Sequence, residues 1–164
     1  MRTLVLMRHA KSAYPDGVPD HDRPLAARGI REAGLAGAWL RDEVPPIDAV
    51  LCSTALRTRQ TLDRTGVEAP ASYLEQLYGA TPGTILGEIN QTGDDVRTLL
   101  LVNHEPTVSQ LALGLAGHPG SDPEALGRIE MKFPTSGIAV LRVPGAWSAL
   151  EINGAELVSF HVPR

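Results

Sequence analysis

The chain has 164 residues, of which 43% are hydrophobic and 21% are charged, a composition typical of globular proteins and unlike that of disordered or fibrous chains. With 15 Lys and Arg against 19 Asp and Glu, the formal net charge is −4, so we expect no broad basic surface for nucleic acid. Cys52 is the sole cysteine, which excludes an internal disulfide. The N-terminal apolar run is too short for a signal peptide, and no run reaches the roughly 18 apolar residues of a membrane span. We therefore expect a single domain over residues 1–164, located in the cytoplasm.

The first half of the chain alternates apolar segments with amphipathic ones. Residues 3–7 form a short apolar run that leads directly into polar residues, a pattern typical of a buried strand that ends in a loop. Residues 14–24 are rich in Pro and Asp, which indicates a loop. Pro45 and Pro46 end the helix that follows. The elements predicted in this half are a strand at 3–7, a helix at 26–44, a strand at 49–51, and a helix that Ser53 or Thr54 caps and that runs to Thr65 before Gly66.

The second half begins with a short predicted strand around residues 72–74. Thr81 and Pro82 fit the N-cap and first position of a helix that Gly93 closes. Residues 98–102 contain four consecutive aliphatic side chains and are the clearest buried strand. The remaining predicted elements are a helix from Pro106 to Gly117, one or two helical turns near 124–131, and strands at 138–143, 146–152 and 156–162, the last two joined as a hairpin by Asn153 and Gly154.

Strands that alternate with helices predict an α/β fold. We expect a three-layer sandwich with a mostly parallel central sheet, helices on both faces, and antiparallel strands at the C-terminal end. Such sheets bind ligands beyond the carboxyl ends of their strands. Candidate functional residues are therefore sought in the segments that directly follow strands.

Basic and imidazole side chains follow three of the predicted strands. Arg8 and His9 follow the first strand, Arg57 lies in the first turn of the helix after the second, and His104 follows the fourth. The carboxyl ends of parallel strands meet at one edge, and a helical Cα–Cβ bond tilts toward the helix N-terminus, so the four side chains are expected to converge. In a chain of negative net charge such a cluster suits a dianion, and phosphate matches the paired donors of guanidinium. Spacing alone leaves open the alternative that they are solvated loop residues.

The residues at these strand ends resemble motifs of a known family. Residues 8–12 (RHAKS), directly after an N-terminal strand, resemble the signature of the histidine phosphatase superfamily, which has the phosphoglycerate-mutase-like fold. Residues 53–57 (STALR) are similar to the second block of that family, in which an arginine four residues after a serine holds the phosphoryl group. Residues 103–106 (NHEP) are similar to its third block, which carries the second histidine. Thr54 stands where the family often has proline, a departure that should alter the turn but not the arginine.

Two further segments narrow the resemblance. Residues 20–25 (DHDRPL), with Gly29 beyond them, and residues 74–79 (LEQLYG) are most similar to the short branch known as phosphohistidine phosphatases. The resemblance extends from the first predicted strand to the fourth. It is therefore far more specific than a single motif.

The resemblance implies roles for these residues. His9, kept neutral, would attack phosphorus in line and become a phosphohistidine that water then cleaves. The residues that would bind the equatorial oxygens and stabilise charge in the transition state are Arg8, Arg57 and His104. Glu75 stands where the superfamily places its proton donor, and Glu105 is the substitute candidate. No metal and no cofactor is expected.

Several other polar residues have competing interpretations. Arg23 could contact substrate or pair with Asp20 or Asp22, and the ion pair is favoured, whereas for Arg57 a surface pair with Asp63 is the less favoured alternative. Lys11 either adds positive charge at the edge of the sheet or is solvated. A structural or solvent-exposed position is expected for three histidines, His21, His118 and His161. Cys52 is expected to be a small core residue.

We therefore expect a metal-independent phosphatase that acts through a phospho-His9 intermediate. The short chain leaves little for a lid, and an open pocket would admit a phosphohistidine displayed on a protein. Hydrolysis of small phosphate esters or nucleotides is the enzymatic alternative, and a non-catalytic phosphohistidine-binding module is the alternative from another class. Mutase activity is a third possibility. The expected partner is a phosphorylated protein or a small phosphate ester, with no nucleic acid and no membrane, and the oligomeric state is left open.

Overall fold

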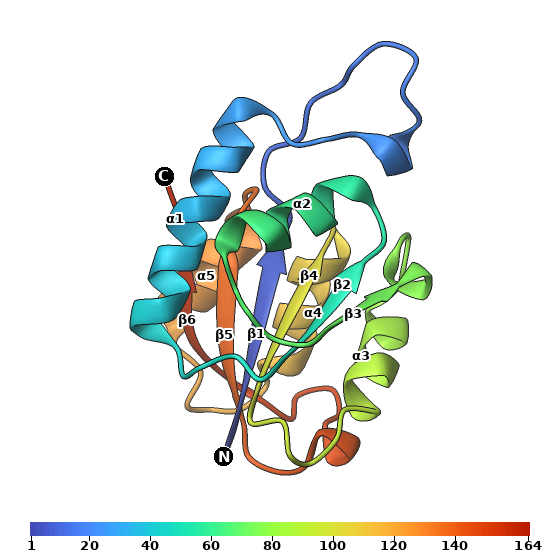
Figure 1. Cartoon of the computed structure of the whole chain (residues 1–164). Coiled ribbons are helices and arrows are strands. Elements are labelled where there is room, and N and C mark those ends of the chain that lie inside the picture. The colour runs from blue at the N-terminus through green and yellow to red at the C-terminus, as the bar shows by residue number, and fades with distance from the viewer.

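The computed structural model describes residues 1–164 as one six-stranded sheet with helices packed on both faces (Figure 1). The strands are β1 (Arg2–Arg8), β2 (Ala49–Ser53), β3 (Ala71–Leu74), β4 (Thr98–Asn103), β5 (Ile138–Val143) and β6 (Glu156–His161). The α-helices are α1 (Ala27–Glu43), α2 (Leu56–Thr65), α3 (Pro82–Asn90), α4 (Thr107–Leu115) and α5 (Pro123–Met131). Three short 3-10 helices are η1 (Asp20–Asp22), η2 (Glu75–Leu77) and η3 (Trp147–Ala149).

The strand order in the sheet is β3-β2-β4-β1-β5-β6. The four strands from β3 to β1 run parallel, whereas β5 is antiparallel to both β1 and β6. This is the predicted α/β class, a mostly parallel sheet with antiparallel C-terminal strands. The central strands β1 and β4 are apolar on both faces because helices cover both sides of a parallel sheet.

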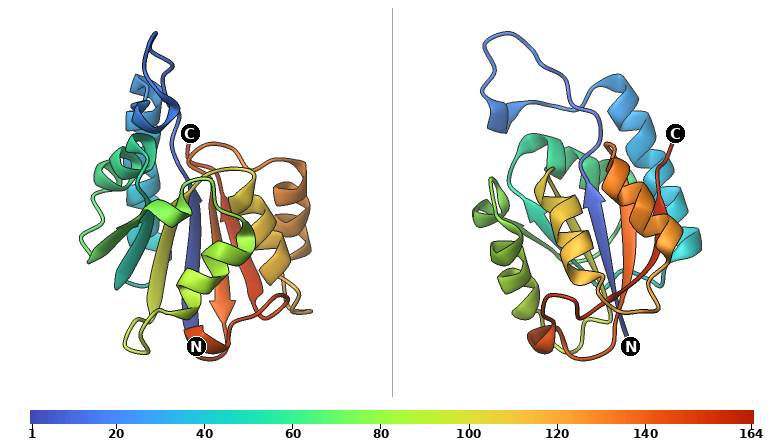
Figure 2. Two further views of the ribbon diagram at one scale, coloured as in Figure 1. Left: turned by 90° about the vertical axis from the view of Figure 1, so that its right-hand side faces the viewer. Right: turned by 180° about the vertical axis from the view of Figure 1, so that it is seen from behind.

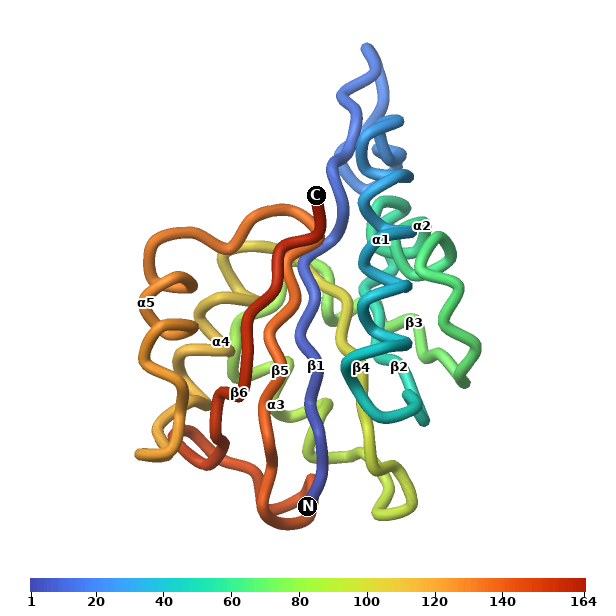
Figure 3. Tube along the Cα trace, turned by 90° about the vertical axis from the view of Figure 1, so that its left-hand side faces the viewer, coloured from blue at the N-terminus to red at the C-terminus, as the bar shows by residue number.

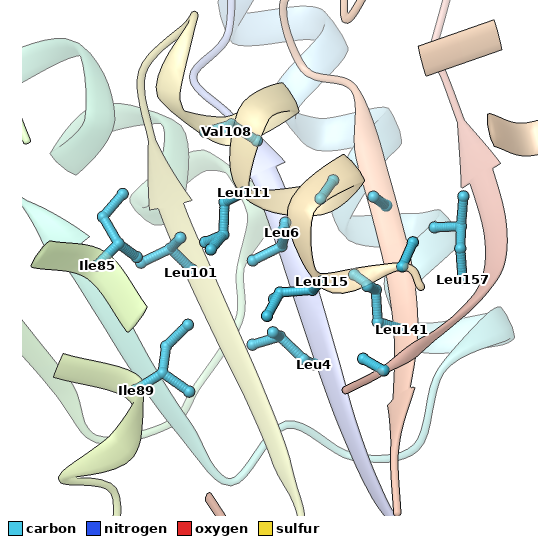
Figure 4. Close-up of a cluster of buried hydrophobic side chains, with 14 of the residues drawn as sticks. Leu4, Leu6, Ile85, Ile89, Leu101, Val108, Leu111, Leu115, Leu141 and Leu157 are labelled. Carbon is cyan, nitrogen blue, oxygen red and sulfur yellow. The ribbon is translucent and has the colours of Figure 1, made fainter. Parts of the chain in front are cut away.

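Alternate residues of β1 belong to two separate hydrophobic cores. Leu4 and Leu6 pack with α3, α4 and α5 in the larger core of 23 buried residues, part of which is drawn in Figure 4. Val5 and Met7 pack with α1 and α2 in a core of 11 buried residues. Figure 3 shows these two helical layers on opposite sides of the sheet. Burial on both faces fixes the register of β1, and with it the place where the strand ends and the polar segment begins.

A long polar loop extends beyond the carboxyl edge of the sheet. Figure 2 shows the segment between β1 and α1 reaching outward and returning through η1 toward α2. Its two ends are joined at the base, where the main-chain N–H of Ala13 donates to the oxygen of Pro24 at 2.8 Å and that of Ala26 donates to Lys11 at 2.9 Å. The predicted loop at 14–24 is confirmed, with one 3-10 turn inside it.

Several sequence predictions were wrong. Residues 146–152 form no strand: they contain the 3-10 helix η3 (Trp147–Ala149), and the side chains of Trp147 and Leu150 are buried. Asn153 and Gly154 therefore do not join a hairpin, and β6 pairs with β5 instead. The α2 N-cap is Ala55, not Ser53 or Thr54, although the Ser53 hydroxyl does accept the Ala55 N–H at 3.3 Å.

The helix after Thr81 ends earlier than predicted. The Thr81 hydroxyl caps α3 by accepting the Thr84 N–H, as expected. The helix then ends at Asn90, three residues before Gly93. Asn90 donates its side-chain amide to the main-chain oxygens of Trp147 and Leu150, at 2.8 and 2.9 Å, so tertiary contacts fix this end of the helix. No helix of the chain has the length and apolar character needed to cross a membrane.

Candidate active site

The ends of β1, β2 and β4 meet at one edge of the sheet. Arg8 pairs in register with Asn103, and Cys52 pairs with Val102, so the residues that follow these strands are neighbours. The main-chain N–H of His9 donates to the oxygen of Asn103 at 3.0 Å. The geometry predicted for the strand ends is therefore present, and Figure 1 shows the three strands pointing to the same edge.

His9 is buried and held by its own chain neighbour. Its ring Nδ1 lies 2.7 Å from the main-chain oxygen of Ala10. A carbonyl oxygen only accepts, so Nδ1 carries the proton and Nε2 has its lone pair free. Burial lowers the pKa of the His9 ring to about 4, against the raising effect of the Ala10 hydrogen bond. The neutral ring with a free Nε2 is the form that a nucleophile requires.

Positive side chains gather around this ring. The charges that further lower the pKa of His9 belong to Arg57, Arg8 and Arg23. Three guanidinium groups around a neutral imidazole, of which Arg57 and Arg23 share the single carboxylate of Asp20, form an environment that favours a bound anion. The four predicted residues, Arg8, His9, Arg57 and His104, are thus brought together.

His104 faces His9 across the site. The centroids of the two rings are 5.4 Å apart. Nε2 of His104 lies 2.9 Å from the Ser53 hydroxyl oxygen, which also accepts the Ala55 N–H. A hydroxyl has one O–H and two lone pairs, so that of Ser53 can accept from Ala55 and also donate to Nε2, and in that arrangement the proton of His104 lies on Nδ1. That buried Nδ1 has no hydrogen-bond partner. Burial, with contributions from His9 and Arg57, lowers the pKa of His104 to about 3.

Arg57 lies in the first turn of α2 with its side chain only 8% exposed. One terminal nitrogen donates to the main-chain oxygen of Asp20 at 2.7 Å, and the other donates to the Asp20 carboxylate at 3.1 Å. Its Nε is buried and has no partner. The alternative of a surface pair with Asp63 is therefore wrong, since the acidic partner is Asp20.

Arg8 is the last residue of β1 and is bound to the segment that precedes β5. One of its terminal nitrogens donates to the main-chain oxygen of Phe133 at 2.9 Å, and its Nε is buried without a partner. Burial lowers the pKa of Arg8, partly offset by the charge of Glu105. Three buried nitrogens without partners thus belong to residues expected to bind phosphoryl oxygens, namely Arg8, Arg57 and His104. Buried polar nitrogens are normally satisfied, so these three have hydrogen-bonding capacity that the protein itself does not use.

Thr61 connects α2 to the segment after His9. Its hydroxyl accepts the main-chain N–H of Ala10 at 2.9 Å and donates to the main-chain oxygen of Arg57 at 2.7 Å. The two hydrogen bonds use both functions of one buried hydroxyl. The segment after His9 and the helix that carries Arg57 are therefore fixed relative to each other.

The two candidate proton donors lie apart from this cluster. Glu75 is exposed on η2, and its carboxylate has no hydrogen bond or ion pair in the structure. Glu105 accepts the N–H of Ser109 at 2.6 Å and its hydroxyl at 2.8 Å, which caps the first turn of α4. Neither carboxylate contacts the phosphoryl-binding side chains, whereas Glu105 already has a structural function.

Arg23 is held away from direct contact with the two histidines. Its Nε donates to Asp20 at 3.1 Å, a terminal nitrogen donates to the Ser12 hydroxyl at 2.8 Å, and the guanidinium stacks 4.0 Å above the Tyr14 ring. The favoured ion pair is confirmed, and its partner is Asp20 rather than Asp22. Lys11 is exposed at the same edge.

The remaining histidines and the cysteine have structural surroundings, as expected. His161 stacks on Trp39 with ring centroids 4.6 Å apart, and His118 is exposed and accepts the Gly120 N–H. His21 bonds through Nε2 to the Thr54 hydroxyl at 3.0 Å. Cys52 is fully buried, and burial raises its pKa to about 12, so its thiol is not reactive at neutral pH. No group of three or more His, Cys, Asp and Glu side chains is arranged to hold a metal ion.

Four polar residues near the site were not among the predicted site residues, although Asp20 was a predicted ion-pair partner of Arg23. Asp20 and Tyr78 are hydrogen-bonded to each other at 2.6 Å, and the Tyr78 ring lies 5.7 Å from that of His104. Asn103 and Ser136 flank the main chain of His9, and their buried side-chain polar atoms have no partners. Ser136 has a positive φ of 65°, and no pattern in the sequence predicts this backbone conformation.

Comparison with known proteins agrees with this geometry. Residues 4–83 match the model of the histidine phosphatase superfamily (branch 1). The chain is 66% identical to an uncharacterized protein of Mycobacterium tuberculosis over 96% of this chain and 100% of that protein. It is 33% identical to the phosphohistidine phosphatase SixA of Escherichia coli, covering 83% of this chain and 82% of SixA.

A solved structure is also closely similar. A provisionally assigned phosphohistidine phosphatase SixA from Nakamurella multipartitia has a TM-score of 0.90 and 42% identity, covering 99% of this chain and 96% of that one. The family resemblance read from the strand-end motifs is therefore confirmed. The chain belongs to the histidine phosphatase superfamily, in its SixA-like branch, and is a phosphatase.

Proposed function

We propose that this phosphatase removes the phosphoryl group of a phosphohistidine carried on a protein, through a covalent phospho-His9 intermediate and without a metal ion. The observation that carries the proposal is the pair of neutral imidazoles 5.4 Å apart, surrounded by arginine and histidine nitrogens that have no acceptor. The name of the relative in Escherichia coli supports the substrate class.

The first step transfers the phosphoryl group to His9. Nε2 forms a bond to phosphorus while the bond between phosphorus and the leaving nitrogen breaks, and the leaving imidazole takes up a proton. Arg8, Arg57 and His104 donate to the three equatorial oxygens, where charge grows in the transition state. The hydrogen bond from Nδ1 to Ala10 stabilises the positive charge that develops on the His9 ring.

The second step restores the enzyme. Water attacks the phosphorus of phospho-His9, the bond from phosphorus to Nε2 breaks, and inorganic phosphate leaves. A carboxylic acid would supply the proton in the first step and its carboxylate would accept the proton of water in the second. Glu75 suits this role better than Glu105, because its carboxylate is not engaged by other groups of the protein.

The surroundings of the site support a protein substrate. The segments that border the carboxyl edge of the sheet beside His104 are the polar loop with η1 and the short η2 turn (Figure 1). Neither forms an additional domain over the site. The absence of a covering domain favours a histidine displayed on another protein, since an enclosed pocket would select small molecules.

The mechanism is tested with a chromogenic phosphate ester in the presence of a metal chelator. We expect the wild type to turn over, His9→Ala to be inactive, and the exposed His118→Ala to serve as an unchanged control. A radiolabelled substrate should leave acid-labile label on the wild type and none on His9→Ala. Turnover that survives His9→Ala would remove the proposed nucleophile. Loss of wild-type activity in chelator would contradict the proposal that the enzyme needs no metal ion.

The substrate class is tested separately. Phosphohistidine-carrying proteins are compared with small phosphate esters and nucleotides by kcat/KM, and we expect the phosphohistidine proteins to rank first. A higher value for an ester or nucleotide would assign the enzyme to small molecules. Transfer of the group to a second alcohol in place of phosphate release would indicate a mutase.

A further inference from the structure

Asp20 is the most heavily bonded carboxylate at the edge of the site. Its Oδ2 accepts from Arg57 at 3.1 Å and from the Tyr78 hydroxyl at 2.6 Å, and its Oδ1 accepts from Arg23 at 3.1 Å. Its main-chain oxygen accepts two more hydrogen bonds, from Arg57 at 2.7 Å and from the main-chain N–H of Arg23 at 3.2 Å. The five hydrogen bonds come from three residues in separate parts of the chain, Arg23, Arg57 and Tyr78.

The geometry of the Arg57 contact leaves one side of the guanidinium free. A guanidinium has five N–H donors arranged as a fork. Asp20 occupies the end of the fork, since both terminal nitrogens of Arg57 donate to it. The buried Nε and one remaining N–H of a terminal nitrogen form the lateral pair, and Nε has no partner. The Asp20 contact therefore fixes the plane of Arg57 and leaves its lateral Nε–H without a partner in the protein.

The loop that carries Asp20 is itself fixed. Arg23 links Asp20 to Ser12, which lies three residues after His9, and stacks on Tyr14. Tyr78 links Asp20 to η2, where its ring contacts the rings of His21 and His104 edge-on, at 4.8 and 5.7 Å. The position of Asp20 is thus set from both sides of the site, as expected of a residue that orients another.

The charge state of Asp20 fits a positioning role and does not fit the role of proton donor. The hydrogen bond from Tyr78 lowers the pKa of Asp20 to about 2, against the effect of partial burial and with reinforcement from Arg57 and Arg23. Asp20 is therefore a carboxylate at neutral pH. A group that protonates a leaving imidazole must hold a proton at that pH, which this carboxylate does not.

We propose that Asp20 is a positioning residue for phosphoryl transfer, which holds the Arg57 guanidinium so that its lateral donors face the phosphoryl group on its way to His9. This inference rests on the proposed function, because the orientation of Arg57 affects turnover only if Arg57 contacts the transferred group. In the opposite case Asp20 would compete with substrate, because its carboxylate would occupy Arg57 and substrate would have to displace it. Substitution of Asp20 should lower activity if Asp20 positions Arg57, and raise activity if Asp20 competes with substrate.

The test is a double-mutant cycle between Asp20 and Arg57. The variants are Asp20→Ala, Asp20→Asn, Arg57→Ala and the double variant Asp20→Ala/Arg57→Ala, with the exposed Asp16→Asn of the same loop as matched control. We expect Asp20→Ala to lower kcat and kcat/KM together by about 10- to 100-fold, the loss typical of a misaligned catalytic group. Asp20→Asn, which keeps an acceptor oxygen, should lose less. In the Arg57→Ala background the same Asp20→Ala change should alter kcat by less than about threefold, because the group it orients is gone.

A second measurement does not depend on turnover. Tungstate, a tetrahedral oxyanion, is titrated calorimetrically into each variant, and thermal unfolding verifies that each is folded. We expect Asp20→Ala to weaken tungstate binding about tenfold in the wild-type background and hardly at all without Arg57. Equal losses in both backgrounds would overturn the positioning role. Tighter tungstate binding or faster turnover by Asp20→Ala would show instead that Asp20 competes with substrate for Arg57. If the wild type is active only through a residue other than His9, the proposed function fails, whereas the tungstate cycle still reports on Asp20.

Discussion

The rings of His9 and His104 lie 5.4 Å apart with their planes tilted by 58°, although 94 residues separate them along the chain. The two rings are therefore direct neighbours at the carboxyl edge of the sheet. Burial keeps both rings neutral, with pKa values of about 4 for His9 and about 3 for His104. The same burial that prepares a nucleophile therefore makes the folded state sensitive to acid.

We predict that stability falls when the pH decreases from about 7 to about 4. In the unfolded chain a histidine has a pKa of about 6.5, so between these values the unfolded chain binds more protons than the folded one. The free energy of unfolding then rises with pH, and for His9 alone the slope approaches about 1.4 kcal/mol per pH unit. Urea denaturation at pH 7, 6 and 5 measures the slope. His9→Asn serves as reference and should show a shallower dependence, and an equal slope in both proteins would contradict the pKa of about 4 for His9.

Arg57→Ala should lose far more activity than Arg23→Ala. Arg57 holds a buried, unpartnered Nε toward the site, whereas the donors of Arg23 are directed at Asp20, Ser12 and the main chain. Removal of one donor to the transition state costs about 10²- to 10³-fold in kcat, and loss of Arg23 should cost less than about tenfold because it acts only through Asp20. Steady-state kinetics with one phosphate ester decides the order, with the exposed Arg31→Ala as control. Equal losses would mean that the phosphoryl group binds elsewhere.

The proton donor can be identified from its dependence on the leaving group. If Glu75 protonates the leaving atom, Glu75→Gln should slow phenyl phosphate by about 10²-fold or more and leave 2,4-dinitrophenyl phosphate almost unchanged, because a good leaving group needs no proton. Glu105→Gln should leave the ratio of the two rates as in the wild type, since its carboxylate binds Ser109. A changed ratio in Glu105→Gln alone would transfer the role to Glu105.

The strand ends of the site could be predicted from the sequence because their signals are local. The apolar runs of β1 and β4 end directly at Arg8 and Asn103, and a parallel sheet places such ends at one edge. The partner of Arg57 had no local signal, since Asp20 lies 37 residues away in a segment whose polar composition equally suits a solvated loop. Contacts of this kind depend on how the loop returns to α2, which composition does not encode.

The failed strand at 146–152 has a similar cause. Trp147 and Leu150 are buried, as the apolar pattern required, but they enter the larger core from a 3-10 turn. The indole N–H donates to the main-chain oxygen of Val96 at 2.7 Å, and Asn90 binds the turn from α3. Burial is readable from hydrophobicity, whereas the backbone conformation here is decided by partners that are distant in the sequence.

Two glycines of the same helix should respond oppositely to alanine. A Cβ at Gly37 would lie 1.9 Å from the main-chain oxygen of Thr65, at the end of α2, whereas a Cβ at Gly34 would meet no atom within 4 Å. Gly37→Ala must push α1 away from α2 and should cost about 1–3 kcal/mol, and Gly34→Ala should stabilise the helix by up to about 1 kcal/mol. Chemical denaturation of both variants measures the difference. Because α2 also carries Arg57 and the Thr61 hydroxyl that anchors Ala10, Gly37→Ala should lower kcat as well, while Gly34→Ala should leave it unchanged. A stable, fully active Gly37→Ala would show that the contact between α1 and α2 does not position the site.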